Sequence, residues 1–153
     1  MFTLEEDDTG EEEVKFLHFQ SGAGERLLDL NLIVEVLPMV ALEYFEESTS
    51  PYFLGGLRYR GEFVPVFSLK AGLQSEKNPD YFLIVLAYEN RKLALLAQNV
   101  MEVLSLRPDC IEKLPIGASS SVVIVKVKDS YLRVCEPAHF FTADASQVWT
   151  ELL

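Results

Sequence analysis

Short apolar runs, separated by polar turns, extend along most of the chain and predict a structure built from β-strands. Leucines alternate with polar residues at 28–32, the two-residue period of a strand with one buried face. Residues 82–88 form an unbroken apolar run, and the polar pair at 89–90 separates it from a second run at 92–97, as in a hairpin. The body of the chain shows no long amphipathic helical pattern. We therefore predict an all-β fold of about nine or ten strands, in barrels or a sandwich.

The last part of the chain follows the same pattern, with two interruptions before it. Val123, Val125 and Val127 alternate with other residues that include Lys126 and Lys128, and after the turn at 129–130 a further strand is expected at 131–135. Residues 71–80 are polar and contain glycine and proline, which indicates a linker or long loop. The segment 107–115 opens with a Pro-Asp pair, typical of a single helical turn.

Three landmarks recur along the chain at a nearly constant spacing. The pairs are FLHF at 16–19 and FLIV at 82–85, Glu-Val-Leu at 35–37 and 102–104, and RGEFVPVFS at 60–68 and KDSYLRVCE at 128–136. Each offset is about 67 residues, which is typical of an internal repeat. We expect two similar β-lobes, about 14–75 and 80–141, joined by the polar linker.

The two ends of the chain differ from its body. Residues 1–13 carry seven acidic side chains and no basic one, which predicts a disordered acidic tail. A partner-facing acidic arm is the alternative. Residues 142–153 are expected to form a tail or a short helix capped by Asp144. Such a helix would dock on the body of the protein or bind a partner.

Composition and charge narrow the class of protein. A chain of 153 residues suits one domain, and a net charge of -11 disfavours binding to nucleic acid or to anionic membranes. The longest apolar runs are well short of the roughly 18 residues of a membrane helix, and the first residues are acidic. We therefore expect a cytoplasmic protein without membrane insertion, in which Cys110 and Cys135 are free buried thiols.

Side chains that could support catalysis are few. His18 and His139 lie far apart in the sequence, and each is expected to be structural. The common zinc, calcium and phosphate motifs are absent from the sequence, and Gly22 and Gly24 fit a turn between strands. We predict a non-enzymatic protein without cofactor or metal. The alternative, an enzyme with an unrecognised carboxylate pair, requires a deep pocket with converging acidic groups.

The stretch GGLRYRGEFVPVFSL combines charged residues with an apolar strand. Arg60 within it, and Glu35 upstream, each border an apolar segment, where an unpaired charge is costly. We expect the two to form an ion pair. Two separately solvated surface charges are the alternative.

Pro65 lies at the centre of the strand in this stretch and lacks an N–H group for the hydrogen-bond ladder. Such a strand is expected at the edge of a sheet or at a bulge. Phe63, Val66 and Phe67 flank the proline, and either the second lobe or a partner protein would cover them.

Several segments together resemble a known family. PYFLGGLRYRGEFVPVFSL is similar to the signature of CheW-like domains, PxFxxGVxNxRGxxVPVxDL. RLLDLNLIVEVL resembles the family's strand-plus-glutamate segment, with Asp29 and Glu35 in register. YENRKLALLAQNVMEVLSLRPDCIEKLP and DSYLRVCEPAHFF resemble the second-lobe hairpin and the final strand. The likeness covers about residues 14–141.

A few positions depart from the family pattern. The turn before Arg60 is one residue shorter, and the usual asparagine is either missing or replaced by Arg58. Ser68, Gln98 and Glu136 stand where aspartates are usual. We interpret the chain as a divergent member of the family.

The resemblance implies two intertwined five-stranded SH3-like β-barrels and a non-enzymatic adaptor. Such an adaptor couples the signalling tip of methyl-accepting chemoreceptors to the regulatory domain of a CheA-type histidine kinase. Glu35, Arg60 and Gly61 match family positions tied to lobe structure and partner binding, and Gly56 matches as a turn glycine. The candidate protein-binding or interface-supporting residues are therefore Glu35, Gly56, Arg58, Arg60, Gly61, Phe63, Pro65 and Phe67. An adaptor of a non-flagellar chemosensory pathway, such as twitching motility, is the alternative.

Overall fold

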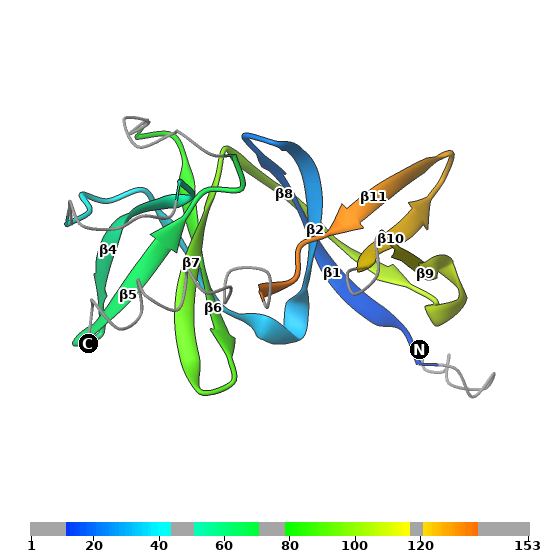
Figure 1. Ribbon diagram of the computed structural model, residues 1–153, viewed down its shortest axis with the longest axis horizontal. Coiled ribbons are helices and arrows are strands. Elements are labelled where there is room, and N and C mark those ends of the chain that lie inside the picture. Colours follow the sequence, from blue (N-terminus) through cyan, green and yellow to red (C-terminus); the bar gives the residue numbers. More distant parts are fainter. Residues whose placement is uncertain (1–11, 44–50, 71–78, 117–120, 138–153) are drawn as a thin grey trace.

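Two β-sheets lie side by side along the long axis of the protein (Figure 1). The computed structural model describes residues 12–43, 51–70, 79–116 and 121–137. The expectations for most of the acidic tail, most of the polar linker, His139 and the C-terminal segment fall outside these residues. Within them the all-β prediction is confirmed, with eleven strands and two single helical turns.

The first sheet has six strands in the order β8-β1-β2-β11-β10-β9. Its strands are β1 (Val14–Ser21), β2 (Gly24–Asp29), β8 (Asn99–Leu106), β9 (Ile111–Pro115), β10 (Ser121–Val127) and β11 (Ser130–Val134). The second sheet has five strands in the order β3-β6-β7-β5-β4. Its strands are β3 (Ile33–Pro38), β4 (Phe53–Tyr59), β5 (Glu62–Phe67), β6 (Phe82–Tyr88) and β7 (Arg91–Ala97).

The two sheets exchange strands between the halves of the chain. β1 and β2 come from the first half but pair in a sheet with β8 to β11, whereas β6 and β7 pair with β3 to β5. If β1 to β5 are matched with β6, β7, β8, β10 and β11, both sheets have the same strand order, with β9 added to the first. The two parallel pairs, β2 with β11 and β7 with β5, also correspond. The strand order thus agrees with the predicted repeat.

The sheets divide the chain differently from the two expected lobes. We placed one lobe at about 14–75 and the other at about 80–141, but each sheet contains strands from both ranges. The reason is that each half gives its first two strands to the sheet built by the last strands of the other half. This arrangement agrees with the intertwining that the family resemblance implied.

The predicted hairpins and the predicted single turn are confirmed. Glu89 and Asn90, between β6 and β7, both have positive φ angles of 50° and 65°, which is the backbone of a type I′ hairpin turn. The Pro-Asp pair opens the 3-10 turn η3 (Pro108–Cys110). Cys110 and Cys135 are both free, but Cys110 is only half-buried.

The leucine alternation at 28–32 was wrongly interpreted as one continuous strand. β2 ends at Asp29, and the 3-10 turn η2 (Leu30–Leu32) follows. The Asp29 carboxylate accepts a hydrogen bond from the backbone N–H of Asn31 at 2.9 Å, which stabilises the turn instead of a strand. β3 then starts in the other sheet. This turn is where the chain crosses between the sheets.

The apolar core has three parts. One cluster lies between the sheets and includes Phe19 and Leu28 of the first sheet with Phe67 and Ile84 of the second. Each sheet also has a separate buried cluster of its own, on the face that does not contribute to the shared cluster. Each sheet therefore buries side chains on both faces, as a curled sheet does.

Candidate protein-binding site

The candidate residues gather around the hairpin formed by β4 and β5. Glu35 is the exception, since it lies on β3. β3 and β4 are the two edge strands of the second sheet. A contact between Glu35 and the end of β4 therefore joins the two edges and helps to hold the sheet in its curl.

The predicted ion pair between Glu35 and Arg60 is confirmed. Arg60 Nη2 lies 3.1 Å from Glu35 Oε1, and the Tyr59 hydroxyl donates a 2.6 Å hydrogen bond to the same oxygen. The Arg60 guanidinium also lies over the Tyr59 ring, 5.2 Å from its centroid. The Arg60 side chain is 74% exposed and that of Glu35 is 37% exposed, so solvent screens their attraction. The pair fixes positions more than it adds stability.

Tyr59 is the buried member of this group. Its hydrogen bond to Glu35 raises the pKa of the phenol, because deprotonation would remove the donor. Burial raises the pKa further, and the charge of Arg60 acts in the opposite direction. No sequence pattern singled out Tyr59, although it directly precedes Arg60.

Gly56, Arg58 and Phe63 form a stack, which we call the Phe63 stack, on one face of the β4–β5 hairpin. A Cβ atom on Gly56 would lie 2.4 Å from Cζ of Phe63, so the ring occupies the space of the missing side chain. The Arg58 guanidinium lies 4.7 Å from the centroid of the same ring. Arg58 Nε is 3.3 Å from Glu43 Oε2. An aromatic ring packed between a glycine and a guanidinium makes a rigid surface feature.

The expected role of Gly56 as a turn glycine is wrong. Gly56 lies inside β4 and does not have a positive φ angle. A residue without a side chain is needed there because the Phe63 ring covers the position. Gly61 is the glycine of the turn between β4 and β5, with a φ angle of 82° and no atom within 4 Å of a Cβ there. The two glycines therefore meet different requirements, one of space and one of backbone conformation.

Gly55 and Glu43 are structural residues that sequence reasoning missed. The backbone groups of Glu43 and Gly56 exchange two hydrogen bonds, of 2.9 and 2.7 Å, so a segment outside the named strands covers the edge of β4. A Cβ atom on Gly55 would lie 2.6 Å from the Glu43 carbonyl oxygen, and Gly55 has a φ angle of 150°. Two adjacent glycines within a strand pattern were the available signal.

Pro65 does not lie on an edge strand. β5 lies between β4 and β7, with Pro65 opposite Gly56. The β4–β5 pair contains a register shift between Phe53 and Gly55, but this bulge lies in β4 and not at the proline. The parallel pairing with β7 includes only Val66 and Phe67, so it starts after the proline. This late start is what allows proline in an interior strand.

Phe67 and Val66 are fully buried, whereas Phe63 is half-buried. The Phe67 ring packs edge-on against Phe53, with 5.9 Å between the ring centroids. The protein itself therefore covers Phe67 and Val66. Phe67 can support a binding surface from beneath but cannot contact a partner.

Two equivalent exposed apolar edges were not anticipated from the sequence. Val34 and Val36 are exposed on β3, and Met101 and Val103 are exposed on β8. Each pair encloses a glutamate, so we call Val34-Glu35-Val36 the β3 triplet and Met101-Glu102-Val103 the β8 triplet. β3 and β8 are matching edge strands of the two sheets. The repeated Glu-Val-Leu motif was the signal.

Both triplets begin with a bulge. Glu35 pairs with Val85 and Ile33 with Leu86, so Val34 is an extra residue in β3. In the same way Met101 is the extra residue of β8. A bulge turns the strand and interrupts its ladder, which protects an exposed edge from uncontrolled pairing.

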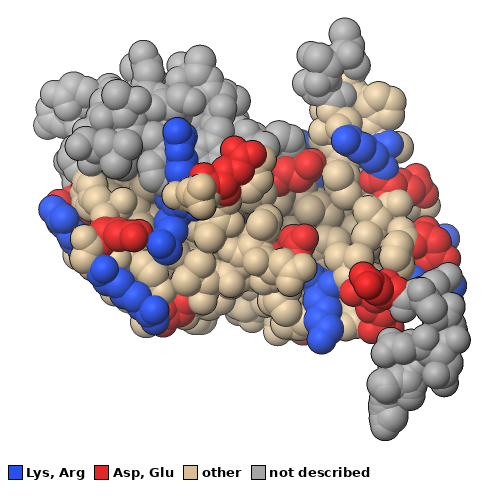
Figure 2. Space-filling view, turned by 90° about the horizontal axis from the view of Figure 1, so that it is seen from below, with Lys and Arg blue, Asp and Glu red and all other residues tan. Residues whose placement is uncertain are grey.

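Charged side chains do not form a field of one sign on the face shown in Figure 2. Acidic and basic groups alternate around its periphery, with a broad area of neutral residues between them. Among the residues that the structure describes, no cluster of three metal-ligating side chains occurs. None of the described helical segments is long and apolar enough to cross a membrane.

The profile of the CheW-like domain matches residues 15–136. The chain belongs to the CheW-like domain family. The match extends over nearly all of the strands in both sheets. CheW-like domains are scaffold or adaptor modules of chemotaxis signalling and are not enzymes, and this agrees with the expectation from the sequence.

A solved structure shows the same CheW-like fold. The crystal structure of the scaffolding protein TtCheW from Thermoanaerobacter tengcongensis superposes with a TM-score of 0.73 at 23% sequence identity. The alignment covers 87% of this chain and 90% of that one. A search of curated sequences found no match.

Proposed function

We propose that this CheW-like protein couples chemoreceptors to a CheA-type histidine kinase. It would hold the kinase regulatory domain and the receptor signalling tip together, so that a change in the receptor shifts the activity of the kinase. The observation that carries the proposal is the presence of two matching apolar edges, one on each sheet. An adaptor needs two separate binding faces, and the β3 and β8 triplets supply them.

The chemistry of the triplets suits protein recognition. Exposed apolar side chains next to a fixed charge supply both burial and orientation when a partner docks. In the β3 triplet, Glu35 is fixed by Tyr59 and Arg60, and the Phe63 stack lies on the same hairpin as these two residues. The net charge of -11 would tune association rates and the choice of partner more than affinity.

Arg58 favours a second candidate, an adaptor of a non-flagellar chemosensory pathway with altered partners. Of the four residues that depart from the family pattern, Arg58 is the exposed one. Ser68 is buried, and its hydroxyl accepts a hydrogen bond from the Lys70 backbone at 3.1 Å. Gln98 and Glu136 are half-buried. Among these four residues, Arg58 is therefore the one that would contact an altered partner most directly.

Calorimetry with two purified partners tests the proposal. The partners are a CheA-type regulatory domain and a receptor signalling fragment from the same organism. We expect each to bind with a Kd below about 100 μM, or about 5.5 kcal/mol. Absence of binding to both at that concentration would refute the coupling role. Binding of the kinase domain alone would favour the second candidate.

Variants of the triplets assign the two faces. Val36→Asp and Val103→Asp should each weaken one partner at least about 30-fold, as loss of a central apolar contact does. Tyr131→Asp is the control, because Tyr131 is at least as exposed as the two valines but lies on β11, outside both triplets. Binding that survives both triplet substitutions would show that the partners dock elsewhere.

A further inference from the structure

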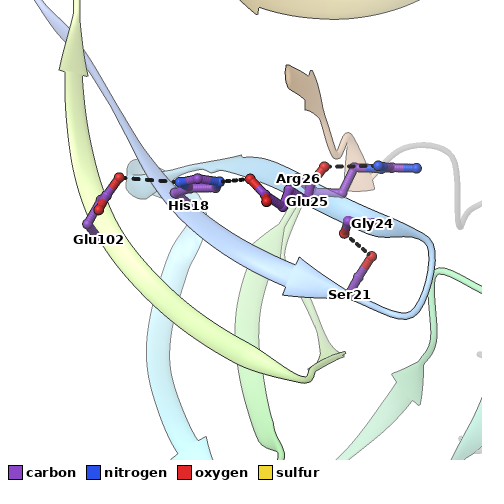
Figure 3. A network of polar contacts seen from close by, with 6 residues as sticks. All are labelled: His18, Ser21, Gly24, Glu25, Arg26 and Glu102. Atoms are coloured by element: carbon purple, nitrogen blue, oxygen red, sulfur yellow. Dashed lines mark hydrogen bonds and ion pairs between the residues drawn. The ribbon is translucent and has the colours of Figure 1, made fainter. Parts of the chain in front are cut away.

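His18 on β1 lies between two carboxylates from neighbouring strands, as Figure 3 shows. Its Nε2 atom is 2.8 Å from Glu25 Oε1 on β2, and its Nδ1 atom is 3.4 Å from Glu102 Oε2 on β8. The imidazole is only 10% exposed, whereas the Glu25 and Glu102 side chains are 45% and 58% exposed. One nearly buried ring therefore connects three adjacent strands.

Glu102 is the central residue of the β8 triplet. It pairs directly with His18 across the β1–β8 ladder, and the register shifts at the next pair, where Met101 is the extra residue. The contact with His18 thus holds the residue that directly follows the bulge. Met101 and Val103, the two exposed apolar residues, lie on either side of this anchor.

The matching glutamate of the other sheet is held by a different cation. Glu35 also directly follows a bulge, and its partners are Arg60 and Tyr59. An arginine stays charged at every physiological pH, whereas histidine is the side chain whose charge ordinarily changes between about pH 5 and 8. The equivalent glutamates of the two halves are therefore held by different side chains. Arg60 has a constant charge, whereas the charge of a histidine such as His18 can change.

The geometry around His18 distinguishes its two charge states. A protonated imidazole donates a hydrogen bond from each nitrogen, so both carboxylates are satisfied. A neutral ring keeps one N–H, and its other nitrogen becomes an acceptor that faces a carboxylate oxygen. Because the contact with Glu25 is the shorter one, we expect the remaining N–H to stay there, so that the contact with Glu102 is the one lost.

Glu25 and Glu102 are the charged groups that face His18 among the described residues. Leu27, its partner across the β1–β2 ladder, is apolar and fully buried. The nearby Arg26 guanidinium donates to the backbone oxygen of Glu25 at 2.9 Å and points away from the ring. Removal of the imidazole proton therefore leaves two negative groups without a cation between them.

We propose that His18 is a proton-dependent anchor for the bulged edge of β8. The charged ring holds Glu102 and keeps Met101 and Val103 in place, and the neutral ring releases this edge. The edge of β3 is held through Arg60, which keeps its charge over the range in which histidine ordinarily changes charge. The inference does not depend on the identity of the partners, because it concerns the local stability of one strand.

Hydrogen exchange of the full-length protein tests the proposal. A His139→Gln background leaves His18 as the only histidine. Glutamates ordinarily titrate well below pH 6, so exchange is measured at pH 6 and pH 7.5 and corrected for the intrinsic rate. We expect the protection of the β8 amides to fall about threefold at the higher pH, the size expected of a partly exposed ion pair. The β3 amides should keep their protection.

Two matched variants at equivalent positions supply the control. Glu102→Gln should remove the pH dependence of β8, because a side-chain amide can donate to the neutral ring. Glu35→Gln should lower protection in β3 but leave the pH dependence of β8 unchanged. An equal loss in β3 and β8, constant protection of β8, or a pH dependence that survives Glu102→Gln would each overturn the proposal. None of these readouts involves a partner, so they are independent of the test of coupling.

Discussion

Tyr59 and Arg60 contact the same oxygen of Glu35 but contribute in different ways. The tyrosine is buried and its hydroxyl has one fixed direction, whereas the arginine is largely exposed and its charge is screened. Tyr59 therefore sets the position of the carboxylate within the fold. Arg60 presents a guanidinium at the surface, held in place by the carboxylate and by the Tyr59 ring.

Substitution of Arg60 should separate stability from binding. Arg60→Ala is expected to lower the free energy of unfolding by less than about 1 kcal/mol, because the ion pair is exposed. The affinity for the partner at the β3 edge should fall by a larger amount. Chemical unfolding and calorimetry measure the two effects. An affinity loss no greater than the stability loss would make Arg60 an ordinary surface charge.

The raised pKa of Tyr59 predicts a loss of stability in alkali. A group whose pKa is higher in the folded than in the unfolded state stabilises the fold below its unfolded value, near pH 10 for tyrosine. This contribution disappears as the pH rises through the folded value. Tyr59→Phe should therefore flatten the decline of the unfolding free energy above about pH 10. Tyr131→Phe, a surface control, should keep the wild-type decline.

At the scale of the element, the β4–β5 hairpin depends on two glycines with separate functions. Gly56 leaves space for the Phe63 ring, and Gly61 adopts a left-handed backbone in the turn. The ring then carries Arg58 on its exposed side. The shape of this surface thus follows from the absence of a single side chain beneath it.

A double-mutant cycle measures this dependence. Gly56→Ala should destabilise the protein by about 1–3 kcal/mol, because the added methyl group displaces the ring. In the Phe63→Leu background the same substitution should cost clearly less. Gly61→Ala is the matched control, since its cost of about 1 kcal/mol comes from backbone strain and should not depend on residue 63. Additive effects of Gly56→Ala and Phe63→Leu would contradict the stack.

At the scale of the whole molecule, strand exchange makes each half of the chain part of both sheets. β1 and β2 pair with each other, but their other neighbours, β8 and β11, come from the second half of the chain. In the second sheet, the edge strand β3 pairs with β6, and β5 lies between β4 and β7, so both need strands from the second half. The cluster between the sheets also draws on both halves, through Phe19 and Ile84 for example. Neither half contains a complete sheet.

A chain divided between residues 74 and 75 tests this interdependence. Each fragment alone should lack cooperative unfolding, because its strands have no complete sheet to join. An equimolar mixture should recover the dispersed NMR spectrum of a folded protein, with a folded fraction that rises with fragment concentration. A fragment that folds alone would show that the halves are independent units.

The local elements could be predicted from the sequence because they depend on neighbouring residues. The hairpin at Glu89-Asn90 and the turn at Pro108 follow from short-range turn chemistry, and both are confirmed. The ion pair of Glu35 and Arg60 followed from the cost of an unpaired charge beside apolar segments. These inferences needed no knowledge of the tertiary fold.

The remaining features depend on contacts between distant segments. The repeat showed that the halves are alike but not which sheet each strand joins, because register and pairing are non-local. Gly56 is small because of Phe63, and His18 is placed by Glu102, a residue 84 positions away. The bulges that expose Val34 and Met101 likewise appear only when the paired strands are known.

The strand exchange also has a consequence for the origin of the protein. Two identical half-length chains, each lending its first two strands to the other, would form a dimer with the strand orders observed here, apart from the added β9. Joining the two chains end to end would give one polypeptide with the same sheets. The equivalent glutamates would then have begun as one ancestral position, which was free after the fusion to acquire an arginine partner in one copy and a histidine partner in the other.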